Sequence, residues 1–234
     1  MRVMAIGGNP DDIEFMCGGT LLRCKERGDD IVMCVSTNGS QGHYNILSPH
    51  LSCIRKREAR QSAEVVGAEI MLLDLPDAGP YPEPWQRDLY VEAIRHANPD
   101  MILTHYPYDY MTDHYYVSQN VLDASFWCAV PQYYTQSLGT STVPAVFFWD
   151  TLGGLGGFQP TEWVDVSEVW DKKVEMLLCH QSQALWLKEH DDIDYVEFMA
   201  TAARFRGLQC GVKYAEAFSA LMRWPRVKTY RMLP

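Results

Sequence analysis

The sequence predicts an α/β fold in which a mostly parallel sheet is flanked by helices within a single domain. Short apolar runs alternate with segments of helical spacing four times along the first half of the chain. These runs are typical of strands that are buried on both faces. The length of 234 residues and the 47% hydrophobic composition suit one large domain with a packed core.

The first 130 residues contain the regular alternation. We expect strands at 2–7, 30–37, 69–75 and 101–105, and helices at 18–27, 54–66, 86–97 and 113–128. Gly28 and Gly67 follow two of these helices, where glycine commonly ends a helix. The segment 76–84, "PDAGPYPEP", is predicted to be a loop because its prolines cannot continue a helix or a strand.

The rest of the chain is less regular, and we expect it to pack on the core as an extension spanning residues 131–234. "AVFFWD" is typical of a strand, and "LGGLGGFQP" of a loop that is either a mobile lid or an ordinary connection. Residues 166–180 and 195–206 have helical spacing. "VKYAEAFSAL" fits either a late strand or a short helix.

Composition excludes several function classes. The net charge of −10 argues against a nucleic-acid-binding protein, which would carry a basic stripe. No apolar segment approaches the roughly 20 residues needed to cross a bilayer, and the first residues do not resemble a signal peptide. The seven cysteines are odd in number and form no CxxC pair, which favours free thiols in a reducing, cytoplasmic setting.

The candidate functional residues follow the predicted strands. "NPDD" (9–12) comes after the first strand, 38–42 after the second, Asp77 after the third and 105–114 after the fourth. In an open parallel sheet, ligands bind in the crevice at the carboxyl ends of the strands. We therefore expect these loops to converge on one site.

Asp11, Asp12 and His114 are the residues with the clearest chemistry. A catalytic zinc site uses three nitrogen or oxygen ligands, and a neighbouring carboxylate that is not a ligand can act as general base. Two structural interpretations remain open. The Asp-Asp pair can cap a helix and complement its dipole, and an Asp-His pair is often purely structural.

Several motifs, in order along the chain, resemble one family. "AIGGNPDDIEFMCGGTL" is similar to the opening of the PIG-L/LmbE-like N-acetylglucosaminyl deacetylases, where a strand leads into Ala-His-Pro-Asp-Asp-x-Glu and Gly-Gly-Thr-Leu. "STNGSQG", "RKREARQSAEVVGA", "DLPDAG" and "PDMILTHYPYDYMTDH" resemble its next blocks. "KKVEMLLCHQSQ" and "RFRGLQCGVKYAEAF" resemble its two C-terminal blocks.

The resemblance implies a Rossmann-like fold and a metal-dependent hydrolase that removes an N-acetyl group from an N-acetylglucosamine-type sugar or its conjugate. A divalent metal, usually zinc, would be held at the positions of Asn9, Asp12 and His114, with Asp11 as general base. Arg55 and Asp77 would hold sugar hydroxyls. The family often forms homo-oligomers, so a homo-oligomer is expected.

Two departures from the family pattern support an alternative function. Asn9 replaces the family's metal-binding histidine with an amide, which is a poorer ligand for zinc. Met111 replaces a second site histidine and cannot donate a useful hydrogen bond. The alternative is a catalytically weakened relative that binds a sugar-like ligand.

Two further histidines are candidates for the site. His180 matches a family block and is predicted to have a catalytic role, the alternative being a buried histidine bonded to a backbone carbonyl. His105 ends the fourth predicted strand, where it is a candidate to reach the crevice.

Overall fold

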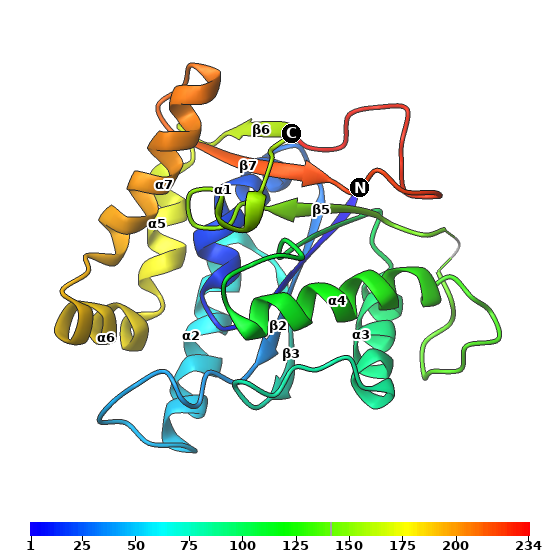
Figure 1. Cartoon of the computed structure of the whole chain (residues 1–234), viewed down its shortest axis with the longest axis horizontal. Helices are drawn as coiled ribbons and strands as arrows, with labels where there is room; N and C mark the ends of the chain where they lie inside the picture. The colour runs from blue at the N-terminus through cyan, green and yellow to red at the C-terminus, as the bar shows by residue number, and fades with distance from the viewer. Residues whose placement is uncertain (141) are drawn as a thin grey trace.

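The computed structural model describes residues 1–140 and 142–234, which form an α/β fold around one seven-stranded sheet (Figure 1). The order of strands across the sheet is β3-β2-β1-β4-β5-β7-β6. The strands are β1 (Arg2–Gly7), β2 (Asp30–Thr37), β3 (Glu69–Leu75), β4 (Met101–Thr104), β5 (Ala145–Trp149), β6 (Glu162–Asp165) and β7 (Ala215–Ala220).

The sheet is mostly parallel, as predicted. Strand β1 pairs in parallel with β2 and β4, β2 with β3, and β4 with β5. The two strands at the other edge are antiparallel, because β7 runs opposite to both β5 and β6. The segment "VKYAEAFSAL", which was predicted to be either a strand or a short helix, therefore contains the strand β7. Strand β6 was not predicted.

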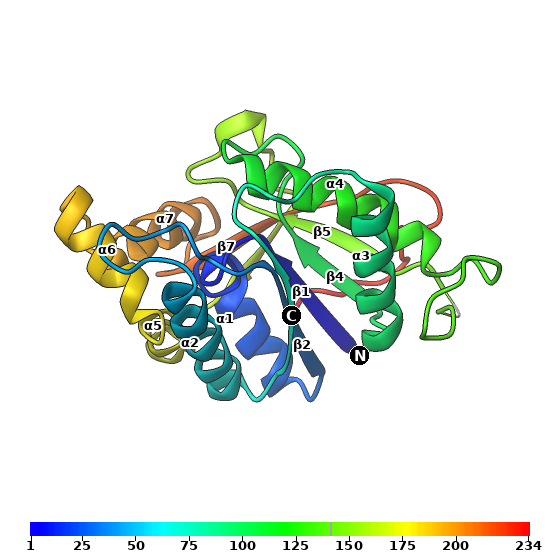
Figure 2. The ribbon, with the colours of Figure 1, turned by 90° about the horizontal axis from the view of Figure 1, so that it is seen from below.

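Helices cover both faces of the sheet (Figure 2). They are α1 (Asp12–Glu26), α2 (His50–Val66), α3 (Pro84–Ala97), α4 (Thr112–Trp127), α5 (Trp170–Leu178), α6 (Gln181–Asp191) and α7 (Tyr195–Cys210). Buried side chains of α1, α2, α5 and α7 pack on one face in one apolar cluster. Those of α3 and α4 pack on the opposite face in a second cluster. Because helices pack on both faces of the sheet, the side chains of the central strands are apolar on both faces.

Several predicted helix boundaries were wrong. Helix α1 begins at Asp12 instead of residue 18, so the metal-candidate carboxylate lies in its first turn. The helix predicted at 166–180 begins only at Trp170, because the N–H of Val166 still bonds to the carbonyl of Tyr214 beside the sheet. Helix α6 was not predicted and begins directly after His180.

A buried ion pair joins the C-terminal half of the chain to α1. Glu216 of β7 accepts hydrogen bonds from the backbone N–H groups of Gly19 and Thr20, at 2.8 and 2.7 Å. Lys173 of α5 pairs with Glu216 and donates to the carbonyl of Phe15 at 2.8 Å. A Cβ atom on Gly19 would lie 2.6 Å from Val166, so only glycine permits this close approach.

Two further predictions concern the whole chain. Among the described residues, no helix has both the length and the apolar composition needed to cross a membrane. All seven cysteines lie in the described part of the chain and are free, as predicted. Cys53 and Cys210 are exposed.

Candidate active site

The loops that follow β1, β2, β3 and β4 meet at a cavity of about 500 Å³. The register Ile6↔Cys34 and Ile6↔Thr104 brings the carboxyl ends of the three central strands level with one another. The structure thus brings together the segments that sequence reasoning expected to converge. The predicted site residues on its wall are Asn9, Asp11, Asp12, Arg55, Asp77 and His114.

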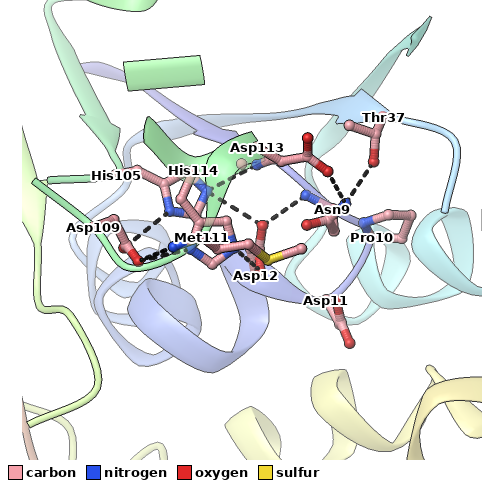
Figure 3. A network of polar contacts seen from close by, with 12 residues as sticks. Asn9, Pro10, Asp11, Asp12, Thr37, His105, Asp109, Met111, Asp113 and His114 are labelled. Carbon is pink, nitrogen blue, oxygen red and sulfur yellow. Dashed lines mark hydrogen bonds and ion pairs between the residues drawn. The ribbon is translucent and has the colours of Figure 1, made fainter. Parts of the chain in front are cut away.

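Four side chains form a closed ring of alternating carboxylates and imidazoles beside the cavity, three of them buried and that of Asp12 13% exposed (Figure 3). Asp12 Oδ1 lies 3.3 Å from His114 Nε2, and Asp12 Oδ2 lies 3.2 Å from His105 Nε2. Asp109 closes the ring, with Oδ1 3.2 Å from His114 Nδ1 and Oδ2 3.9 Å from His105 Nδ1. Asp12, His105 and His114 each present a possible ligand atom within 4.8 Å of the others.

The electrostatics of this ring favour a cation. Burial would lower the pKa of His114, but the charges of Asp12 and Asp109 raise it to about 10. Burial would raise the pKa of Asp12, but His114 and His105 hold it well below its usual value. The ring therefore stabilises positive charge at the edge that faces the cavity, and its nitrogen and carboxylate donors fit a divalent metal ion.

Asp11 lies apart from the ring although it is the neighbour of Asp12. Its φ of 105° is unusual for a residue other than glycine. Its side chain points away from the imidazoles in Figure 3. Asp11 Oδ1 accepts from Arg55 Nη2 at 3.2 Å, and Oδ2 accepts from the Tyr195 hydroxyl at 2.8 Å. Burial raises the pKa of Asp11 to about 6 against the opposing effects of Arg55, His180 and Tyr195.

Asn9 is tied to the surrounding loops through its amide nitrogen. Nδ2 donates to Thr37 Oγ1 at 2.8 Å and to Asp113 Oδ2 at 3.2 Å. The Asn9 backbone N–H donates to Asp12 Oδ2 at 2.6 Å. Since Nδ2 is committed, the carbonyl oxygen Oδ1 is the side-chain atom that remains for a ligand role. Whether Asn9 binds metal stays a prediction.

The two residues predicted to hold sugar hydroxyls also hold protein groups. Arg55 Nη2 donates to the carbonyl of Pro10 at 2.6 Å in addition to Asp11. Asp77 accepts from the backbone N–H groups of Gly39 and Gln41, at 2.8 and 2.7 Å, and so fastens the loop after β2 to the loop after β3. Both residues line the cavity, and their contact with a sugar stays a prediction.

His180 is not among the residues that line the cavity. It is fully buried, and its Nε2 lies 3.0 Å from Glu14 Oε1. Its catalytic role stays a prediction, but no cavity-lining position supports it. Met111 lines the cavity and directly precedes α4, and its correspondence to a family histidine stays a prediction of the resemblance.

Three residues beside the predicted ones were missed or underrated. His105 was expected only to lie near the crevice, and Asp109 and Tyr195 were not singled out. The spacing His105-x3-Asp109-x4-His114, from the end of β4 to the first turn of α4, is a signal that could have identified Asp109. Tyr195 offers no such signal, because it lies 184 residues from Asp11 in the sequence.

The fold and the site define an α/β protein with a candidate divalent-metal centre at the carboxyl edge of a mostly parallel sheet. The PIG-L family model, described as GlcNAc-PI de-N-acetylase, matches residues 4–125, more than half of the chain. The chain therefore belongs to the PIG-L family.

Three relatives illustrate this membership. The diacetylchitobiose deacetylase of Thermococcus kodakarensis is 27% identical over 92% of this chain and 81% of its own length. The 4-oxalmesaconate hydratase of Pseudomonas putida is 23% identical over 96% of this chain and 90% of its own length. The crystal structure of a 4-carboxy-2-hydroxymuconate hydratase from Pseudomonas putida has a TM-score of 0.84 and 19% identity, and it covers 99% of this chain and 100% of that one. The family and the deacetylase relative confirm the predicted enzyme class, an N-deacetylase.

Proposed function

We propose that this protein is a metal-dependent hydrolase that removes the N-acetyl group from an N-acetylglucosamine-type amino sugar or its conjugate. One observation carries the proposal. Asp12 and His114 face each other 3.3 Å apart on the wall of the cavity, while the separate buried carboxylate of Asp11 lines the same cavity. Two adjacent carboxylates with different partners suit a metal ligand and a general base.

The residues that would hold the ion are Asp12 and His114, with Asn9 contributing through Oδ1. By resemblance to the family the ion is zinc. When bound, a divalent ion lowers the pKa of a water molecule and polarises an amide carbonyl. The raised pKa of His114, caused by Asp12 and Asp109 against burial, supports a centre where positive charge is favoured.

Asp11 would take the proton of the attacking water and pass it to the departing amine. Arg55 and Tyr195 each hold one oxygen of the Asp11 carboxylate, which restricts its orientation within the cavity. Arg55 and Asp77 are proposed to contact the sugar hydroxyls. We also retain the predictions of a homo-oligomer and a cytoplasmic location.

A second candidate is a hydratase, because the Pseudomonas putida relative is similar over 96% of the chain. The charges of the cavity argue against a polycarboxylate substrate of the kind its name describes. Asp11, Asp12, Asp77 and Asp113 line the cavity, whereas Arg55 is the one guanidinium among the described lining residues and already contacts Asp11. A neutral sugar avoids the repulsion that several substrate carboxylates would meet.

The experiment that tests the proposal combines metal analysis with two assays. Zinc-loaded protein should contain one ion per chain and release acetate from N-acetylglucosamine or diacetylchitobiose, and a chelator should abolish this release. Hydration of 4-oxalmesaconate without acetate release would replace the deacetylase with the hydratase. Sugar binding without turnover would support the weakened relative instead.

A further inference from the structure

The ring formed by Asp12, His105, Asp109 and His114 has two different edges. Asp12 and His114 line the cavity, whereas His105 and Asp109 do not, and both of the latter side chains are fully buried. An ion entering from the cavity therefore meets Asp12 Oδ1 and His114 Nε2 first. Their separation of 3.3 Å is about the distance between two ligand atoms of a tetrahedral zinc ion.

Both nitrogens of His105 already face other groups. The backbone N–H of Gly8 donates to His105 Nε2 at 2.9 Å, within the buried core of the site. On the other side of the His105 imidazole, Trp149 Nε1 lies 3.2 Å from Nδ1. An imidazole nitrogen has one in-plane lone pair, so Nε2 cannot bind a metal while it accepts from Gly8.

Gly8 makes this arrangement possible. A Cβ atom at position 8 would lie 3.1 Å from Asp12 Oδ2 and 3.4 Å from His105 Nε2. The absence of a side chain lets the backbone approach both residues and hold the imidazole in place. The nearness of His105 to Asp12 is therefore explained without a shared ion.

We propose that the ring is divided into a ligand edge, Asp12 and His114, and a positioning edge, His105 and Asp109, with His105 outside the metal shell. Asp109 lies 3.2 Å from His114 Nδ1 and orients the His114 imidazole so that its Nε2 faces the cavity. His105 accepts from the Gly8 N–H and so holds the loop in which the next amide, the Asn9 N–H, donates to Asp12 Oδ2 at 2.6 Å, which leaves Oδ1 for the ion. This division deepens the proposed function and rests on it, because it assumes that the site holds a metal.

X-ray absorption spectroscopy of the zinc-loaded wild-type protein tests the division directly, since it counts imidazoles in the metal shell. We expect one imidazole, from His114. Two imidazoles would overturn the division and leave the deacetylase proposal intact. Protein that takes up no zinc would overturn both, and acetate release by the loaded protein reports on the deacetylase separately.

Variants of the positioning edge give a second measurement. We expect Asp109→Asn and His105→Gln to retain one zinc per chain and one imidazole, with affinity weakened about 10- to 100-fold in a chelator competition. Asp109→Ala, which lacks an acceptor for the Nδ1 proton, should weaken zinc binding more than Asp109→Asn.

Asp123→Asn on the exposed face of α4 is the control and should bind zinc like the wild type. Thermal denaturation of the metal-free variants separates positioning from a general loss of folding. Equal affinity of Asp109→Ala and the wild type would overturn the role of Asp109.

Discussion

Asp11 and Asp12 are consecutive residues whose carboxylates have separate partners. Asp12 Oδ1 lies 3.3 Å from His114 Nε2, whereas Asp11 Oδ2 accepts from the Tyr195 hydroxyl at 2.8 Å. The φ of 105° at Asp11 turns the backbone just before α1 and accompanies this divergence. The cost of such a backbone conformation, of order 1–3 kcal/mol, is consistent with a functional requirement.

Asp11→Asn should abolish most of the turnover while sparing metal binding. The amide keeps the size of the side chain but cannot take a proton, so we expect kcat to fall about 10²- to 10⁴-fold. Acetate release measures the rate, and metal analysis measures the ion content. Because Asp12 and His114 are unchanged, one zinc ion per chain should remain.

The matched change at the neighbouring position should affect the metal as well. Asp12→Asn should reduce zinc content as well as the rate. If Asp11→Asn turned over sugar at the wild-type rate, Asp11 would not be the base.

Asn9→His should strengthen zinc binding and weaken the fold. An imidazole is a better zinc ligand than an amide oxygen, so affinity should rise. The change also removes the Nδ2 donor that satisfies Thr37 and Asp113, which we expect to destabilise the protein by about 1–3 kcal/mol. Chelator competition and thermal unfolding of the metal-free protein check the two effects. Unchanged zinc affinity would show that position 9 does not contribute a ligand.

Much of the fold was predictable because each central strand is marked by a short apolar run in its own segment of the sequence. The apolar runs at β1, β2 and β3 matched the observed strands residue for residue. Strand β6 was missed because it has four residues and is paired only with β7, which lies some 50 residues later in the chain. The start of α1 was missed because the paired glycines suggested a beginning where the helix is already in its second turn.

The site was predictable where a motif marked it. Asp11, Asp12 and His114 were found because they follow strands that end at the same edge of the sheet. Asp109 was missed because nothing local shows that a loop carboxylate is fully buried between two imidazoles. Tyr195 reaches Asp11 only through the packing of α7, which no short-range pattern encodes.

Tyr195→Phe tests whether α7 contributes to the catalytic geometry. Removing the hydroxyl leaves one oxygen of Asp11 without its donor, and a hydrogen bond to a charged group contributes about 1.5–3 kcal/mol. We expect kcat to fall roughly 10-fold with little change in KM, because the base would be less well oriented. Tyr134→Phe, on a side chain that is 88% exposed, is the control and should change neither constant. A rise in KM alone would place Tyr195 in substrate binding.

Lys173→Met should be strongly destabilising without any direct effect on the site. Lys173 and Glu216 are 1% and 3% exposed, and Lys173 is the cation that balances the carboxylate inserted against α1. Removing one partner of a buried pair costs about 3–5 kcal/mol, because the remaining charge is uncompensated. Urea denaturation of the metal-free protein measures the loss.

Two comparisons isolate the buried charge as the cause. The double variant Lys173→Met with Glu216→Gln should recover part of the loss, because no charge is then left buried. Lys188→Met removes an exposed pair with Asp192, where the side chains are 62% and 90% exposed, and should change the stability by less than about 0.5 kcal/mol. If Lys173→Met cost no more than Lys188→Met, Lys173 would not be needed to compensate the Glu216 carboxylate that binds Gly19 and Thr20.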